Sequence, residues 1–217
     1  MTVTIESAAP GTALGWVVAE GCSAAPSSPA LLAEVDAAGA RALARKEKPG
    51  TEERRKAVRD LLRHGTYKPT GRGKPASEYL AQAAAEGAFP KINRLVDINN
   101  LVSVETQLPI SLIDLDLAAA HHFRLRWGRE GEQYVFNPSG QVLDLRDLLL
   151  LARLPEDLPC ATPVKDGQAT KTHPGTKRVL GVVYAPASLR AEAEAAARRM
   201  ADLLASHAGA AVTAGVR

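Results

Sequence analysis

The sequence predicts an α+β (mixed α/β) fold in which a mixed sheet is flanked by helices. Three features lead to this prediction. Strand-like apolar patterns occur near the N-terminus and again beyond residue 110, helical patterns lie between them, and an alanine-rich helix follows the last strand. Strands and helices are thus grouped along the chain, whereas a regular βαβ protein would alternate them.

The N-terminal part is expected to contain two strands and two helices. TVTIE (residues 2–6) alternates as a strand does, and ALGWVVAEG (residues 13–21) predicts a second strand. Residues 29–45 carry apolar side chains at helical spacing. After the linker KEKPG (residues 46–50), a threonine followed by two glutamates predicts a helix that runs to about residue 64.

The rest of the chain continues with helices and then with strands. Pro75 fits the first turn of a helix that Gly87 ends, and helical spacing returns over residues 92–102. The later predicted elements are strands at residues 121–127, 132–136, 145–154 and 178–185, with an NPSG turn among them, and a helix at residues 189–204. We expect residues 66–217 to form the main domain and residues 1–65 to pack on it.

Composition indicates an ordinary globular protein, with 46% hydrophobic and 24% charged residues. The 27 basic and 24 acidic side chains leave a net charge of +3, which favours anionic partners only weakly. Basic residues crowd the stretch from residue 41 to residue 74. This stretch predicts either a phosphate-facing surface or a solvated helix face with internal ion pairs.

Cysteine usage and hydropathy indicate in which cellular compartment the protein is expected. Cys22 and Cys160 have neither metal-ligand spacing nor the density of a disulfide scaffold, so buried reduced thiols are expected. The N-terminus has no signal-peptide pattern, and no apolar run approaches the length of a membrane helix. We therefore expect a cytoplasmic protein with no membrane partner.

The loop TGRGKP carries Arg72 and Lys74. Backbone amides freed by glycine, together with a lysine, can hold an anion. The spacing does not fit a nucleotide-binding P-loop, because Pro75 stands where that motif has a hydroxyl residue. The loop is therefore either a phosphodiester contact or an ordinary turn.

A polar row interrupts the apolar pattern of the helix that begins near residue 92. Its members are Asp97, Asn99, Asn100, Ser103 and Glu105. Asparagine is a modest helix former, so its repeated use here suggests that these side chains form specific hydrogen bonds. A ligand pocket and a buried structural network both remain compatible with the row.

Residue types of a serine hydrolase are present in Ser111, Asp114 and His173. No GxSxG nucleophile elbow accompanies them, so their spacing does not establish a triad. His121 and His122 would point to opposite faces of a strand, and no third ligand joins them. We expect neither a metal nor a cofactor.

The late loop DGQATKTHPGTK precedes the last predicted strand. Thr170 and Lys171 in this loop are candidates for contacting a phosphate or a carboxylate, and His173 lies close to them. A plain surface loop is the alternative.

Three longer segments resemble one known family. FPKINRLVDINNLVSVETQLPISLIDLDL (residues 89–117) is similar to the Val-Asp, Asn-rich helix, the Leu/Gln-Pro turn and the Asp-x-Asp corner of phenylalanyl-tRNA synthetase beta chains. GREGEQYVFNPSGQVLDLRDLLLL (residues 128–151) resembles the strand, turn and strand that follow there. YKPTGRGKPASEYL (residues 67–80) resembles freestanding B3/B4 tRNA-editing domain proteins. The order is kept, which makes the resemblance more specific than any short motif.

The resemblance implies a B3/B4-like fold and an editing chemistry. In the synthetase this domain hydrolyses tyrosine wrongly esterified to phenylalanine tRNA, with water attacking an ester held by polar side chains and backbone groups. Asp97 and Asn99 or Asn100 match the family's Asp-x-x-Asn row, and Asp114 matches its corner aspartate. The implied partner is the acceptor end of tRNA or an aminoacyl ligand.

Two positions depart from the synthetase pattern. Ser111 stands where the synthetase has a histidine, and the strand at residues 178–185 contains no glutamate where the synthetase has one. The size of the chain is too small for a complete aminoacyl-tRNA ligase.

Three functions follow as expectations. The first is a trans-acting aminoacyl-tRNA deacylase or editing-like hydrolase. Its catalytic residues would be Asn100, Ser111 and His173, and its substrate-binding residues Arg72, Lys74, Asp97, Asn99, Asp114, Thr170 and Lys171. The second is a non-catalytic module that binds tRNA or an amino acid on the same fold. The third is a hydrolase of free small-molecule esters or amides.

Overall fold

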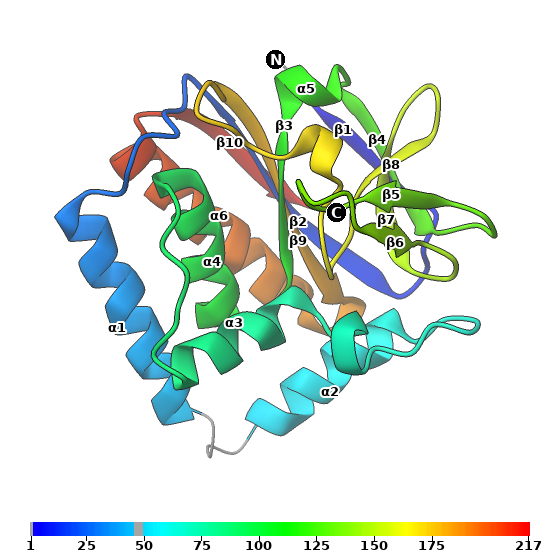
Figure 1. The fold of residues 1–217 in the computed structure, drawn as a ribbon, viewed down its shortest axis with the longest axis horizontal. Coiled ribbons are helices and arrows are strands. Elements are labelled where there is room, and N and C mark those ends of the chain that lie inside the picture. The colour runs from blue at the N-terminus through cyan, green and yellow to red at the C-terminus, as the bar shows by residue number, and fades with distance from the viewer. Residues whose placement is uncertain (1, 46–49) are drawn as a thin grey trace.

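The computed structural model describes residues 2–45 and 50–217 (Figure 1). Most of the predicted KEKPG linker lies outside these residues. The helices are α1 (Pro29–Arg45), α2 (Thr51–Leu62), α3 (Ala76–Ala85), α4 (Arg94–Thr106), α5 (Leu115–Ala118) and α6 (Arg190–Ala208), with 3-10 turns η1 (Gly71–Gly73), η2 (Gln168–Thr170) and η3 (Ala187–Leu189). The strands are β1 (Thr4–Ser7), β2 (Thr12–Glu20), β3 (Ile110–Asp114), β4 (His122–Trp127), β5 (Gln133–Val135), β6 (Val142–Asp144), β7 (Leu149–Arg153), β8 (Leu158–Ala161), β9 (Arg178–Pro186) and β10 (Ala211–Val216). The α+β prediction is confirmed.

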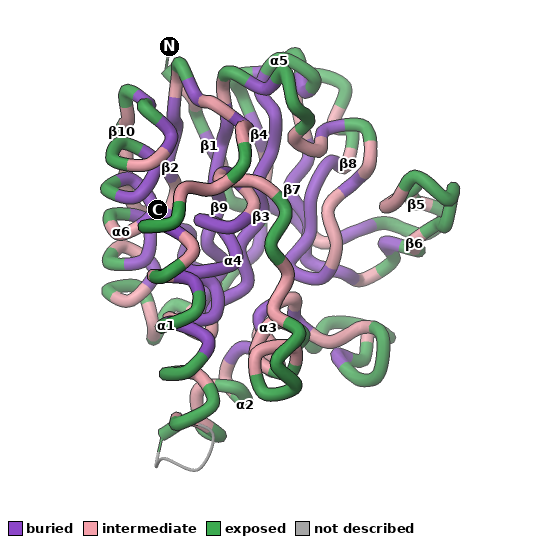
Figure 2. The backbone as a smooth tube through the Cα atoms, turned by 60° about the vertical axis from the view of Figure 1, so that its left-hand side comes forward, coloured by how far each residue is buried: buried purple, intermediate pink, exposed green. Residues whose placement is uncertain are grey.

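The strands form two four-stranded sheets and one hairpin. The first sheet has the order β1-β4-β7-β8 and is mixed, because β1 runs parallel to β4. The second has the order β10-β2-β9-β3 and is antiparallel. β5 and β6 pair only with each other, and Figure 2 shows this hairpin projecting from the body of the protein.

The second sheet is the middle layer of the fold. Helices α1, α4 and α6 lie on one of its faces, and the first sheet packs on the other (Figure 1). Along β2, Val17 packs among the apolar residues of the helices and Val18 among those of the first sheet. Because β2 is buried on both faces, its sequence is a nearly continuous apolar run and does not alternate.

Helix α6 approaches the middle sheet closely because two glycines leave room for it. A Cβ atom added at Gly15 on β2 would lie 2.1 Å from the carbonyl oxygen of Ala193 on α6. One added at Gly181 on β9 would lie 2.8 Å from the sulfur of Met200. Gly15 is therefore required by packing, whereas a side chain at Gly181 would have to displace the flexible end of Met200 and a methyl group of Val17.

The N-terminal 65 residues contribute to the middle sheet. β2 pairs with β9 over nine residue pairs, from Thr12 opposite Pro186 to Glu20 opposite Arg178. The domain boundary at residue 65 stays a prediction. In the described part of the chain, no helix combines the length and the apolar character needed to cross a membrane.

Acidic neighbours compensate much of the basic stretch on α2. Arg59 makes two hydrogen bonds of 2.6 and 2.5 Å to Glu78, and Lys56 lies 2.8 Å from Asp60. Arg63 pairs with Asp60 as well. Along α2, the described residues therefore form a helix face with internal ion pairs.

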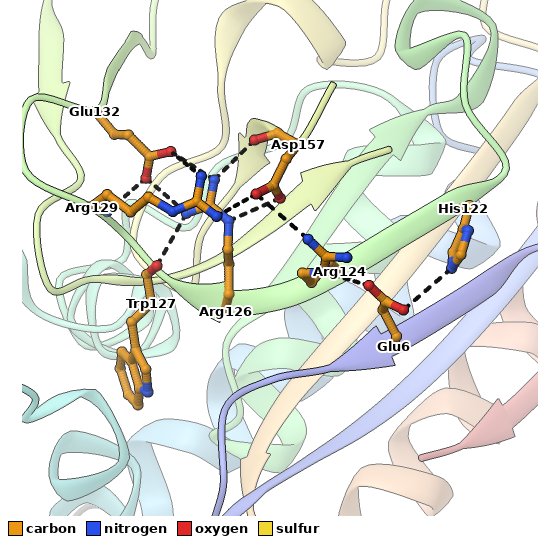
Figure 3. Close-up of polar contacts among 8 residues, drawn as sticks. All are labelled: Glu6, His122, Arg124, Arg126, Trp127, Arg129, Glu132 and Asp157. Carbon is orange, nitrogen blue, oxygen red and sulfur yellow. Dashed lines mark hydrogen bonds and ion pairs between the residues drawn. The ribbon is translucent and has the colours of Figure 1, made fainter. Parts of the chain in front are cut away.

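A buried arginine anchors the turns at the edge of the first sheet (Figure 3). Arg126 on β4 has a side chain that is only 6% exposed, and it donates to Glu132 at 2.7 and 2.8 Å and to Asp157 at 3.0 Å. Arg129 reaches the other oxygen of Asp157 at 2.5 Å. These contacts connect β4 to the turns that precede β5 and β8.

Candidate functional site

A cleft of about 950 Å³ lies between the loop before α3, helices α3 and α4, and the β5–β6 hairpin. We call it the α3–α4 cleft. Its lining residues are Tyr67, Arg72, Gly73, Ala76, Tyr79, Leu80, Asn99, Asn100, Ile110, Phe136, Gln141, Val142, Leu143, Val164 and Lys165. This volume is large enough for a nucleoside with an attached amino acid.

The glycine loop forms one wall of the cleft and is held by two tyrosines. Tyr67 donates its hydroxyl to the carbonyl of Gly73, and Tyr79 donates to the carbonyl of Gly71, both at 2.8 Å. Burial raises the pKa of Tyr67 to about 12, so its hydroxyl keeps the proton it donates. Arg72 stands between these anchors, exposed and without an ion-pair partner among the described residues.

Helix α4 supplies two asparagines to the cleft. The helix starts at Asn93, whose side chain accepts from the amides of Leu95 and Val96. Six and seven residues further on, Asn99 and Asn100 lie side by side, and Asn99 Nδ2 donates to Asn100 Oδ1 at 3.3 Å. Asn99 Oδ1 is left buried with no partner in the described structure. An unpaired buried acceptor costs about 1–3 kcal/mol, and such atoms persist mainly where a ligand or water serves them.

The cleft carries positive charge without carboxylates. Lys165 Nζ lies 4.2 Å from the centre of the Phe136 ring, a cation–π contact, and Arg72 faces the same space. None of the described lining residues is aspartate, glutamate or histidine. An anionic ligand would therefore meet two cations and no opposing charge.

Ser111 lies outside this cleft, in a buried polar network. Its Oγ donates to Asp166 Oδ1 at 2.6 Å and lies 3.0 Å from the hydroxyl of Tyr184. Asp166 also accepts from the amides of Leu112 at 3.2 Å and Thr162 at 3.4 Å. Burial raises the pKa of Asp166 to about 6, although these hydrogen bonds act in the opposite direction. The network connects β3 to the turn that carries Lys165.

The same turn is held by Tyr134 and Lys171. Tyr134 donates its hydroxyl to the carbonyl of Lys165 at 2.5 Å, and burial raises its pKa well above the usual value. Lys171 donates to the carbonyl of Phe136 at 2.5 Å, and burial lowers its pKa. Lys171 thus fixes the hairpin that borders the cleft and does not line the cleft itself.

Asp114 and His173 meet at a third place, the end of β3. Asp114 Oδ1 caps α5 by accepting from the amides of Asp116 and Leu117, and its Oδ2 accepts from Thr176 Oγ1 at 2.6 Å. His173 Nε2 lies 3.5 Å from the same Oδ2, with half of the imidazole exposed. The corner aspartate therefore has a structural partner for each oxygen.

The remaining predicted residues also have local roles or other neighbours. Asp97 accepts from Ser27 at 2.6 Å and from the amide of Ile92 at 2.8 Å, which fixes the segment before α4. Thr170 donates to the carbonyl of Cys160 at 3.2 Å. Lys74 lines a different pocket, described below.

The structure thus brings together Arg72, Asn99 and Asn100 from the predicted set. Ser111, Asp114, His173, Asp97, Thr170, Lys171 and Lys74 do not line the α3–α4 cleft. Their predicted contacts with substrate stay predictions. Sequence reasoning missed Lys165 and Asp166, because nothing in PVKDG except a turn signal distinguishes them and Asp166 is 55 positions from Ser111.

Comparison with protein families identifies the fold. A family model described as the B3/4 domain matches residues 69–209, which is more than half of the chain. The chain belongs to the B3/4 domain family. This domain is found in phenylalanyl-tRNA synthetase beta chains, so the resemblance seen in the sequence is confirmed. A search of curated proteins gives no match to this B3/4 protein.

Proposed function

We propose that this B3/4 protein binds the aminoacyl end of tRNA in the α3–α4 cleft and hydrolyses the ester of mischarged tRNA in trans. One observation carries the proposal. Arg72, Asn99 and Asn100, which the sequence marks as a candidate site, converge with Lys165 in a cleft that has no carboxylate in its lining.

The two cations are suited to phosphodiester groups. Arg72 has no partner to give up, and Lys165 is engaged only with an aromatic face. Tyr67, Tyr79 and Phe136 provide flat apolar surface beside them, on which a base can stack. Binding that depends on such phosphate contacts weakens steeply as salt is raised.

The asparagine pair is suited to an aminoacyl ester. Asn99 Oδ1 is sealed from solvent, so a rotation of its side chain would have to bring it into the cleft, where it would accept from the α-ammonium group; Asn100 would donate through Nδ2 to the ester carbonyl. When water attacks the carbonyl carbon, negative charge grows on that oxygen and the bond to Asn100 strengthens. The ester C–O bond then breaks, the ribose oxygen takes one proton of the attacking water, the other proton passes to solvent, and the amino acid departs as its carboxylate.

A binding module without hydrolysis is the second candidate. Its specific support is the chemistry of the lining, which offers no aspartate, glutamate or histidine as a general base among the described residues. Ser111, at the position of the synthetase histidine, is fully buried and bonded to Asp166. In this case ligands would stabilise the protein by mass action without being consumed.

Deacylation of a panel of mischarged tRNAs, at two salt concentrations, tests the proposal. We expect turnover of one aminoacyl-tRNA that falls about 100-fold in Asn100→Ala, the size expected for loss of a donor to a developing oxyanion. Arg72→Met should raise KM. Arg198→Met, which removes a surface arginine paired with Glu194, is the matched control and should change little.

The outcomes separate the candidates. Unchanged turnover in a folded Asn100→Ala protein would remove the cleft from the reaction. Absence of turnover, together with salt-sensitive binding that Arg72→Met weakens, would establish the binding module. Turnover of free aminoacyl esters at the same rate as aminoacyl-tRNA would point to a small-molecule hydrolase.

A further inference from the structure

A second pocket, of about 510 Å³, lies among helices α1, α2 and α3 and shares no lining residue with the α3–α4 cleft. We call it the three-helix pocket. Its apolar wall is formed by Ala42, Leu43, Val58, Ala81 and Ala85, one or more from each helix. Leu43 is 51% exposed although it belongs to the apolar pattern of α1, so the pocket leaves part of that pattern uncovered.

Most charges around the three-helix pocket cancel in pairs, which leaves Lys74 just before α3 and the exposed Glu86 just past its end. Both oxygens of Glu78 are occupied by Arg59, and Arg55 pairs with Glu52. Lys74 has no hydrogen bond or ion pair among the described residues, and it lines the pocket where α3 begins. An anionic group would therefore find a free ammonium there.

A buried hydroxyl lies next to this cation. Ser77 is only 3% exposed, lines the pocket and has no hydrogen-bond partner in the described structure. Its Oγ is not one of the polar atoms sealed from solvent, so it is reached from the pocket. Ser77 belongs to the first turn of α3, where Pro75 provides no side-chain cap and the helix dipole is positive.

We propose that the three-helix pocket binds small amphiphilic monocarboxylates. The carboxylate accepts from Lys74 and Ser77 at the start of α3, and the hydrocarbon body lies along Val58, Leu43 and Ala81. A single negative charge matches the free ammonium of Lys74, which lies at the opposite end of α3 from Glu86, whereas a phosphate dianion would be repelled by Glu78 and Glu52 nearby. Burial of the hydrocarbon supplies most of the affinity, and the head group supplies the selectivity. This inference does not depend on the proposed function.

Calorimetric titration of the full chain with octanoate, octanol and octylammonium tests the inference, because the three share one hydrocarbon body. We expect octanoate to bind with a 1:1 ratio and about tenfold more tightly than octanol, the change expected for one charge-assisted bond. Lys74→Met keeps the aliphatic stem and should weaken octanoate about tenfold while leaving octanol unchanged. Lys68→Met, at an exposed lysine outside the pocket, is the matched control.

Ala81→Leu provides a second variant that fills the pocket without touching the head-group site. Octanoate binding should be lost in a protein that still unfolds cooperatively. No binding of octanoate, equal affinity for the three ligands, or an undiminished affinity in Lys74→Met would each overturn the inference. Tighter binding of octylammonium than of octanoate would also overturn it, since Glu86 would then be the recognising group.

Discussion

Replacing Asp166 by asparagine should change the way the stability of the protein depends on pH. The folded state raises the pKa of this carboxyl from 3.8 to about 6, chiefly by burial. Between these two values the folded protein holds a proton that the unfolded chain releases. The contribution of Asp166 to stability is therefore fully present below about pH 4 and is lost as the pH rises through 6.

The size of this effect follows from the two pKa values. A change from 3.8 to about 6 corresponds to about 3 kcal/mol in the free energy of unfolding. Asp166 is partly exposed, so about 3 kcal/mol is an upper limit. Between pH 4 and pH 7, Asp166→Asn should gain stability relative to the wild type by up to this amount, because asparagine does not ionise.

Urea unfolding at four pH values, followed by circular dichroism, measures the difference. Asp157→Asn is the control with the opposite sign, since hydrogen bonds from Arg126 and Arg129 outweigh burial and lower the pKa of Asp157. Its stability relative to wild type should fall as the pH rises. Parallel wild-type and Asp166→Asn curves, or an NMR titration of the Asp166 carboxyl below pH 4, would refute the assignment.

Three further predictions concern packing and buried polar groups. Gly15→Ala should destabilise the protein by more than about 2 kcal/mol, because its methyl group would meet the backbone of Ala193. Gly39→Ala should stabilise α1 by about 0.5–1 kcal/mol, because its methyl group would meet only a side-chain carbon at 3.7 Å. Thermal melts of the two variants compare these effects. Arg126→Met should cost about 3–5 kcal/mol in urea unfolding because it leaves two carboxylates without their buried partner, and a loss below 1 kcal/mol would show that solvent replaces the arginine. Ser111→Ala should cost about 1–2 kcal/mol, since Asp166 and Tyr184 each lose a partner; a deacylation rate that falls without this loss of stability would instead place Ser111 on the substrate.

The local patterns of the sequence anticipated most of the regular structure. The helix predicted at residues 29–45 is α1 with the same bounds, and the apolar run at residues 178–185 is β9. β3, α5, β6, β8 and β10 were missed. α5, β6 and β8 are three or four residues long, and β8 contains a proline, so each is too short to show a period. β3 and β10 have five and six residues, and neither alternates strictly between apolar and polar side chains.

Part of the candidate site could be predicted from the sequence, and part of it depends on the fold. Arg72 and the two asparagines lie within 30 positions of one another, on a glycine loop and a helix that the sequence marks clearly, and the structure places them in one cleft. Lys165 reaches that cleft only because the turn after β8 folds back on β3. The hydrogen bond from Ser111 to Asp166 holds this turn, and no local pattern encodes it.

The sequence by itself therefore determined the class of the fold, the family and the polar helix at the centre of the proposed site. These depend on apolar periodicity and on ordered motifs, both of which are properties of neighbouring residues. Only the tertiary structure decided which polar groups find a hydrogen-bond partner within the protein and which are left without one. Asp97, Ser111 and Asp114 find partners from distant segments, whereas Asn99 Oδ1 does not. Satisfaction of a buried polar group depends on what the whole chain brings within about 3 Å of it, which spacing along the sequence does not contain.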